Sequence, residues 1–370
     1  MTDGARAYRF SLAFVGEDYR PLEDAYVEVD ERGLISSVGR GSGGARVGGV
    51  ALPGLVDAHV HTGDYALAGA GLPLPLEDLV APPHGLKHRL LSAMGPGELE
   101  RSVRAALLYM ESTGSTVAAD FREGGLEGVL AARRASSGLR IRPIVLGRPG
   151  PDGDFRAVLE AADGLGLSSP LDHLDSLGSM ASAASAAGKI LAAHVAETRE
   201  ARAAGDLEVV MDAGGFSFIV HGTHLSWDDL AWLASRRVGL VTCPRANGFF
   251  SGSEPPLASA LEAGVELALG TDNSGWVAPD MWREMEAALR ALRRQRPSLA
   301  DPRVVLRSAT LSGARLLGME RVGLIAEGWL ANIVVLDESA VLPAVDPLAS
   351  AVLRGGPGHI RAVITGWMPD

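Results

Sequence analysis

The sequence predicts an α/β protein: a (β/α)8 TIM barrel with a small β-sandwich-like domain formed by the two chain ends. Short apolar runs alternate with amphipathic stretches from about residue 50 to about residue 320, which is typical of a parallel sheet covered by helices. The runs number eight, and eight strand–helix units in roughly 270 residues match the size of such a barrel. A doubly wound open sheet is the alternative, because a count of strands does not prove that the sheet closes.

The barrel strands are expected where continuous apolar runs occur, since strands buried on both faces carry few polar residues. These runs are 51–60, 115–121, 141–147, 163–168, 189–194, 216–221, 238–243 and 265–271. Helices are expected where apolar residues recur at helical spacing. These stretches are 98–110, 126–135, 228–235, 255–263, 280–294 and 301–319.

The two chain ends are expected to form the small domain together. Segments that alternate apolar and polar residues occur at 26–30 and 34–38, and short β-like runs return at 331–336 and 360–365. The predicted small domain is therefore discontinuous and comprises residues 1–50 and 328–370. The predicted barrel comprises residues 51–327.

Composition excludes several classes of function. The chain has 34 basic and 45 acidic residues and a net charge of -11, without the basic stripe of a nucleic-acid-binding protein. Its single cysteine, Cys243, cannot form an intramolecular disulfide, so the fold needs no oxidising compartment. No stretch of about 18 apolar residues and no apolar signal-peptide core occurs. We therefore expect a cytoplasmic protein that binds neither nucleic acid nor membranes.

Five potential metal ligands come at the carboxyl ends of four predicted strands, where barrels place their chemistry. His59 and His61 end the first run, and their i, i+2 spacing puts both imidazoles on one face of the strand. His194, His221 and Asp272 come at the ends of the fifth, sixth and eighth runs. A single histidine after a strand is usually a buried residue whose hydrogen bonds are satisfied. Five potential ligands on one rim are unlikely to be a coincidence. Three or four nitrogen and oxygen ligands with an open position describe a catalytic metal site.

Glu197 lies three residues after His194, just beyond the fifth predicted strand. A carboxylate there can reach the barrel mouth and act as a general acid/base that moves a proton between metal-activated water and the substrate. The alternative is a solvent-facing glutamate in the first turn of a helix, where the helix dipole favours negative charge.

These residues lie in motifs that resemble the amidohydrolase superfamily of metal-dependent hydrolases. The motifs are PGLVDAHVH (53–61), HVAE (194–197), VHGTH (220–224), LGTDN (269–273) and EGWLANIVVLD (327–337), in the order expected for that superfamily. The chain is most similar to the branch that holds cytosine deaminase, guanine deaminase and the triazine hydrolases. The resemblance implies that the metal ligands are His59, His61, His194 and Asp272. It implies that Glu197 is the acid that shuttles the proton, and that His221 and Asp272 activate the attacking water.

The lysine count bears on the number of metals. Relatives with two metals commonly bridge them with a carboxylated lysine after the fourth strand, and the fourth run here has none. Lys87 and Lys189 are the only lysines in the chain, and Lys189 lies five residues before His194, so it points to the opposite strand face. We therefore expect one divalent transition metal. Zinc is expected first, with iron or manganese as alternatives, because histidine and carboxylate ligands suit several metals.

Substrate contacts are expected from the loops that follow the strands. Arg122, Glu123 and Arg148 follow the second and third strands and could contact a polar or anionic substrate group; surface charge or a salt bridge between loops is the alternative. The glycine- and proline-rich segment 62–94 is a candidate lid. Its charged residues, Lys87 among them, are explained equally well as solvated loop charge.

The resulting hypothesis is a mononuclear metal-dependent amidohydrolase that hydrolyses a non-peptide C–N bond of a small molecule and deaminates an aromatic heterocyclic amine. A hydrolase of cyclic amides or triazine-type substrates, which releases no ammonia, is the alternative within this class. A non-catalytic barrel used as a binding or assembly module is the alternative from another class. A homo-oligomer is expected from the resemblance alone.

Overall fold

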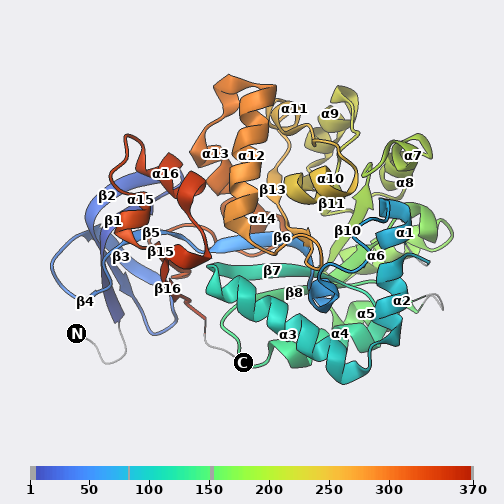
Figure 1. The fold of residues 1–370 in the computed structure, drawn as a ribbon, viewed down its shortest axis with the longest axis horizontal. Helices are drawn as coiled ribbons and strands as arrows, with labels where there is room; N and C mark the ends of the chain where they lie inside the picture. Colours follow the sequence, from blue (N-terminus) through green and yellow to red (C-terminus); the bar gives the residue numbers. More distant parts are fainter. Residues whose placement is uncertain (1–5, 82–83, 151–153, 368–370) are drawn as a thin grey trace.

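A computed structural model describes residues 6–81, 84–150 and 154–367 of the chain. It contains a parallel sheet surrounded by helices and, to one side, a second sheet built from both chain ends (Figure 1). Residues 1–5 and 368–370 of the predicted small domain, and residues 82–83 of the predicted lid, lie outside the described residues.

The parallel sheet has nine strands in the order β13-β12-β11-β10-β9-β8-β7-β6-β14. The strand bounds are β6 Leu55–His61, β7 Ser115–Arg122, β8 Arg142–Gly147, β9 Gly164–Leu167, β10 Ile190–Val195, β11 Phe218–His221, β12 Gly239–Thr242, β13 Leu267–Leu269 and β14 Asp272–Asn273. All eight predicted runs therefore contribute strands to this sheet.

The sheet curls because its two edges come from neighbouring residues. Only Gly270 and Thr271 separate β13 from β14 along the chain. β13 pairs with β12, whereas β14 pairs with β6, so one short stretch of chain contacts both ends of the strand order. This curled parallel sheet is consistent with the predicted (β/α)8 barrel.

The chain ends pair in a second sheet, in the order β16-β15-β5-β1-β2-β3 with β4 beside β1. Apolar side chains of β1 alternate between two cores over residues 12–15: Leu12 and Phe14 belong to the main core, and Ala13 and Val15 to a separate cluster. The described pairings form a single sheet, and the predicted sandwich-like arrangement is not confirmed. The strand bounds are β1 Arg6–Val15, β2 Arg20–Val29, β3 Ile35–Arg40, β4 Ala45–Arg46, β5 Val50–Pro53, β15 Ile333–Leu336 and β16 Ile360–Ile364.

The first apolar run, 51–60, is divided between the two sheets, whereas the sequence predicted one barrel strand. β5 joins the small sheet and β6 begins the barrel, with Gly54 between them. Gly54 donates its N–H to the carbonyl of Asn332. A β-carbon at Gly54 would lie 2.5 Å from Thr116 Cγ2, so the close approach of β7 favours glycine at this break.

Helices fill the connections between the barrel strands. The predicted helix 301–319 is two helices, α13 and α14, because the backbone leaves the helical conformation at Thr310, where φ is -139°. The bounds are η1 Thr62–Leu67, α1 Leu76–Val80, α2 Leu86–Ala93, α3 Pro96–Ser112, α4 Gly125–Ser136, α5 Phe155–Ala161, η2 Pro170–His173, α6 Leu177–Ala186, α7 Arg199–Ala203, α8 Asp206–Ala213, α9 Trp227–Arg236, α10 Pro244–Phe250, α11 Leu257–Glu262, α12 Met281–Gln295, η3 Pro297–Leu299, α13 Pro302–Ser308, α14 Leu311–Leu316, α15 Glu338–Val341, α16 Pro347–Arg354 and η4 Pro357–His359.

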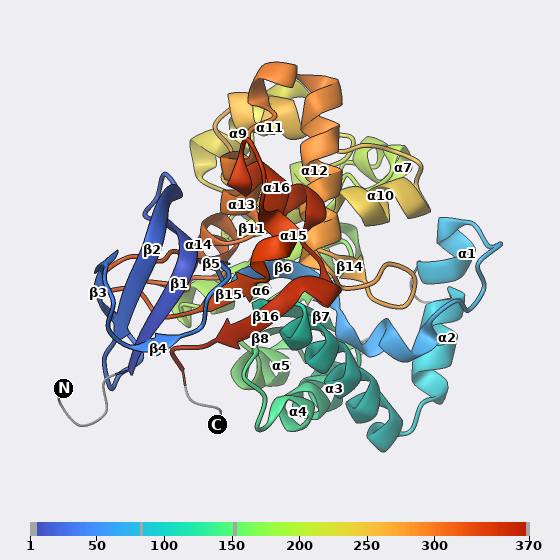
Figure 2. The same cartoon turned by 60° about the vertical axis from the view of Figure 1, so that its left-hand side comes forward.

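The predicted lid segment contains α1 and α2, which lie on the side of the barrel away from the small sheet in both views (Figures 1 and 2). His88 of α2 donates a ring N–H to the carbonyl of Val80 at 3.1 Å, which ties the two helices together. Among the described helices, none combines the length and the apolar character needed to cross a membrane.

Candidate metal centre

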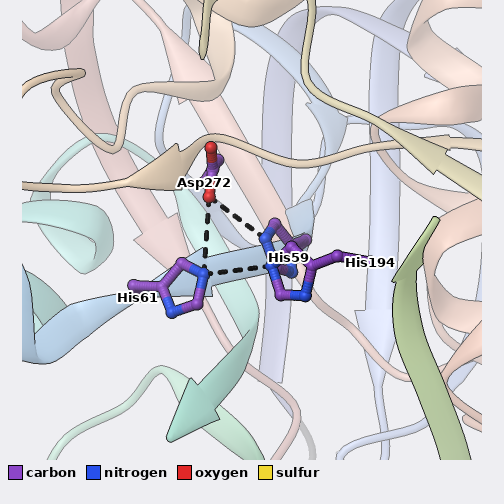
Figure 3. Close-up of side chains that lie close together, drawn as sticks. All are labelled: His59, His61, His194 and Asp272. Carbon is purple, nitrogen blue, oxygen red and sulfur yellow. Dashed lines mark hydrogen bonds and ion pairs between the residues drawn. The ribbon is translucent and has the colours of Figure 1, made fainter. Parts of the chain in front are cut away.

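Four side chains converge at the carboxyl end of the barrel: His59 and His61 from β6, His194 from β10 and Asp272 from β14 (Figure 3). Their potential ligand atoms all lie within 4.8 Å of one another. Asp272 Oδ1 is 3.2 Å from His59 Nε2 and 3.5 Å from His61 Nε2. The structure thus brings together the four residues that the sequence predicted as ligands.

The backbone at two of these strand ends is unusual. The φ angle is 73° at His221 and 64° at Asp272, a left-handed region that residues other than glycine rarely adopt. Such a conformation costs on the order of 1–3 kcal/mol, and residues that hold it cluster at functional sites. Both side chains line the same cavity.

The hydrogen bonds of His61 and His194 determine which ring nitrogen of each can bind a metal. His61 Nδ1 donates to the carbonyl of Phe121 at 3.1 Å, and His194 Nδ1 donates to the carbonyl of Leu167 at 2.8 Å. A neutral imidazole carries one proton, so both Nε2 atoms keep a lone pair. These two atoms face each other at 3.4 Å, where their lone pairs repel unless a cation lies between them. Three imidazoles and one carboxylate fit a divalent transition metal.

Burial favours the protonation states that metal ligands require. It lowers the pKa of His59 to about 3 and, together with the neighbouring histidines, holds the pKa of His194 well below its usual value. Burial alone would raise the pKa of Asp272, but the hydrogen bond with His59 and the nearby imidazoles hold it below its ordinary value. Neutral imidazoles and an ionised carboxylate are the forms that bind metals.

Glu197 and His221 form a proton-handling pair beside the cluster. Glu197 Oε2 is 3.6 Å from His221 Nε2, and desolvation raises the pKa of the Glu197 carboxyl group. Asn247 donates its amide N–H to His221 Nδ1 at 3.1 Å, which leaves the imidazole proton on Nε2, facing Glu197. The pair can therefore hold and move a proton next to the candidate ligands.

A cavity of about 130 Å³ opens at the centre. Helix α1 and the residue after it close one side with apolar side chains. Three of the candidate ligands, the proton-handling pair, α2, the loop after β8 and helix α10 form most of the remaining wall. The lining residues are His61, Leu76, Val80, Ala81, Lys87, Arg148, Ser168, His194, Glu197, His221, Phe250, Asp272 and Asn273.

The three predicted substrate contacts occupy different positions. Arg148 lines the cavity. Arg122 and Glu123 do not belong to its described lining. Their side chains pair with each other at 2.6 Å between Arg122 Nη2 and Glu123 Oε2, and Arg122 is 1% exposed. Substrate contact by these residues stays a prediction, for which the cavity geometry favours Arg148.

Lys87 is not solvated loop charge, the interpretation that the sequence supported at least as well as a role in the candidate lid. It lies in α2, its side chain is 3% exposed, and its Nζ is 2.8 Å from both Asp64 Oδ2 and Glu123 Oε1. Two partners on separate segments explain why this lysine is buried. The available signal was its rarity, since the chain has only two lysines, and Asp64 comes three residues after His61.

Sequence reasoning also missed two residues that support the site, Asp57 and Asn247. Asp57 is fully buried and accepts hydrogen bonds from Thr271, which lies between β13 and β14, and Asn247 fixes the tautomer of His221. A single sequence carries no signal for Asn247, because its partner lies 26 residues away. Cys243 is buried, and burial raises the pKa of its thiol well above the usual value, as expected for a structural cysteine.

Comparison with known proteins identifies the family. Residues 50–366 match the model of the Amidohydrolase family. The chain belongs to this family. It is a hydrolase acting on carbon–nitrogen bonds, as the sequence predicted.

The chain is similar to several known proteins. A putative aminohydrolase of Methanothermobacter thermautotrophicus is 35% identical over 323 residues, which cover 82% of each chain. A 5-methylthioadenosine/S-adenosylhomocysteine deaminase of Pyrococcus abyssi is 33% identical over 192 residues, 48% of this chain and 45% of that one. The crystal structure of an adenosine deaminase from Xanthomonas campestris with bound zinc covers 98% of this chain and 92% of its own, with a TM-score of 0.85 and 21% identity. At that identity the last likeness shows the fold.

Proposed function

We propose that this amidohydrolase is a mononuclear, zinc-dependent enzyme that deaminates an aromatic heterocyclic amine. The observation that carries the proposal is that a candidate metal site and a candidate acid/base pair meet at one cavity. The four candidate ligands converge at this cavity, three of them (His61, His194 and Asp272) line it, and the Glu197–His221 pair lies beside them.

A bound metal would lower the pKa of a water molecule toward 7 and so supply the nucleophile. Asp272 and His221 line the same cavity and would orient that water. Glu197 would accept a proton from the water and deliver it to the ring nitrogen or to the leaving amine. Its raised pKa suits this role, because a general acid works best with a pKa near the working pH.

Three observations support one metal rather than two. The fourth strand, β9 (Gly164–Leu167), carries no lysine that could bridge two metals. Lys189 donates its three N–H groups to backbone carbonyls of residues 159, 160 and 162. Lys87 has two carboxylates at 2.8 Å, which requires a cationic ammonium group. Zinc is the first candidate from the ligand set, with iron or manganese as alternatives.

The size of the cavity supports a small substrate. A cavity of about 150 Å³ holds one benzene molecule, and the cavity here is about 130 Å³. The cavity is therefore close to the size that a single heterocyclic ring needs. The deaminases among the similar proteins favour ammonia as the leaving group, and a cytoplasmic location and a homo-oligomeric state stay predictions.

The test combines metal content with product analysis on protein purified without an affinity tag. Elemental mass spectrometry is expected to give about one transition metal per chain, and a panel of heterocyclic amines is expected to give metal-dependent ammonia release. Two metals per chain would contradict the mononuclear site. Hydrolysis without ammonia would favour a cyclic amide or triazine-type substrate. No metal after supply of zinc, iron and manganese, and no turnover, would favour a non-catalytic barrel.

A further inference from the structure

Two cationic side chains stand together on the cavity wall. Lys87 and Arg148 both line the cavity, and both approach the same oxygen, Glu123 Oε1, at 2.8 Å for Lys87 Nζ and 3.5 Å for Arg148 Nη1. Glu123 Oε1 is also 2.9 Å from His61 Nδ1, on the side of that ring away from the candidate metal position. The two cations therefore lie on the wall beyond His61.

Lys87 retains one donor for a ligand. Its ammonium group has three N–H donors, and its two described ion-pair contacts, with Asp64 Oδ2 and Glu123 Oε1, leave at least one of the three without a described partner. Neither carboxylate belongs to the described cavity lining, whereas Lys87 does. The two carboxylates thus stabilise the charged ammonium group from outside the cavity, and a remaining N–H is available to a group in the cavity.

Arg148 has fewer partners than Lys87, because its guanidinium group has no hydrogen-bond acceptor among the described residues. Its side chain is only 12% exposed, its Nε is buried without a partner, and its single ion-pair contact is the long one to Glu123. A buried donor that forms no hydrogen bond costs about 1–3 kcal/mol, and more when it is charged. A ligand that accepts hydrogen bonds from this guanidinium group would offset the cost of burying it.

We infer that Arg148 and Lys87 form an anion-binding subsite that holds an anionic oxygen group of the substrate, a carboxylate or a phosphate. This inference rests on the proposed function and adds the chemical class of the substrate: a heterocyclic amine that carries an acidic substituent. The planar guanidinium suits two-point binding of such a group, and the ammonium adds a third contact. The ring then extends from the subsite toward Glu197 and the candidate ligands.

The test needs no known substrate, because nicotinate and nicotinamide share one ring and differ in charge. Calorimetry on the zinc-loaded protein is expected to show nicotinate binding at least about 10-fold more tightly than nicotinamide, since charged hydrogen bonds are the stronger ones. The same preference is expected in metal-free protein, which separates the subsite from binding of the carboxylate to zinc. Inorganic phosphate serves as a third probe. Tighter binding of phosphate than of nicotinate assigns the subsite to a phosphoryl group, and the reverse assigns it to a carboxylate.

Matched variants localise the preference. Arg148→Gln is expected to bring the ratio of the two dissociation constants close to one and to leave the protein at least as stable, because it removes a buried guanidinium group whose one described partner is the long ion-pair contact to Glu123. Arg134→Gln is the control, since Arg134 pairs with Glu100 on the surface. Lys87→Gln is expected to reduce the ratio as well, with Lys189→Gln as its control. If Lys87→Gln does not fold, Arg148→Gln still decides.

Two outcomes would overturn the subsite. One is the absence of any preference for nicotinate in the wild-type protein. The other is a preference that survives Arg148→Gln, which would place the carboxylate on the metal or elsewhere. Failure of the proposed function is a separate result, because it appears as missing metal or missing ammonia release. A protein that binds one zinc and releases ammonia from neutral amines, without charge preference, would contradict the subsite alone.

Discussion

Thr271 binds Asp57 twice: its backbone N–H donates to Oδ1 at 3.0 Å, and its hydroxyl donates to Oδ2 at 2.5 Å. Asp57 also accepts the backbone N–H of His59 at 3.3 Å. All three residues are fully buried. This contact links β6 to the short segment between β13 and β14, next to the candidate centre. Because Asp272 directly follows Thr271, the contact sets the position of His59 relative to Asp272.

We predict that Thr271→Val lowers the free energy of unfolding by about 1–3 kcal/mol, because it leaves Asp57 Oδ2 buried without its donor while the shape of the side chain is kept. It is also expected to reduce the metal retained per chain. Urea unfolding and elemental mass spectrometry check both effects. Thr271→Ser keeps the hydroxyl and is the control; if Ser and Val behave alike, the side-chain hydrogen bond does not hold the strands together.

We predict that Glu197→Gln lowers the rate of ammonia release by a factor of about 10² to 10⁴, the usual contribution of a general acid/base. Glutamine keeps the size of the side chain but cannot carry the transferred proton. Metal content is expected to stay at the wild-type level, which separates proton transfer from ligation. Glu200→Gln, three residues on and exposed, is the control for the same substitution. Full turnover by Glu197→Gln would exclude the proton-shuttle role.

Much of the candidate centre could be predicted because it depends on local geometry. Strand alternation places His59 and His61 on one face, and parallel strands bring their carboxyl ends to one edge, where His194 and Asp272 follow. The same reasoning could not find Lys87. Its environment comes from Asp64 and Glu123, on two other segments, and a glycine- and proline-rich stretch carries no periodicity that predicts a buried face.

The division of the first apolar run could not be predicted from the hydrophobic pattern either. Residues on both sides of Gly54 are buried in sheets, so hydrophobicity does not change at the break. What ends β5 is packing: the space at Gly54 is taken by Thr116 of β7. Patterns that report burial predict that a strand is present, but they cannot say which of two sheets it joins.

We predict that Gly270→Ala destabilises the protein by about 1–3 kcal/mol and lowers its metal content, because overpacking forces the backbone to move. A β-carbon at Gly270 would lie 2.7 Å from the Cβ and 2.8 Å from the carbonyl oxygen of His59. Gly178→Ala in helix α6 is the matched control. Its β-carbon would meet open space, so a gain of about 0.5–1 kcal/mol is expected there. Unchanged metal content in Gly270→Ala would show that the β6–β14 spacing tolerates adjustment.

The candidate lid should be sensitive to acid through His88. Burial, and then the nearby charge of Lys87, lowers the pKa of His88 to about 4 from its usual 6.5. The folded state therefore favours the neutral ring, so stability that is fully present above pH 6.5 is lost as the pH falls toward 4. We predict that the wild-type protein loses more unfolding free energy over this range than His88→Gln, which carries no titrating ring. The difference should remain below the full value of about 1.4 kcal/mol per pH unit, because His88 is only half-buried and solvent screens its charge. Urea unfolding at pH 7, 6, 5 and 4 measures it, and parallel pH profiles of the two proteins would contradict the assignment.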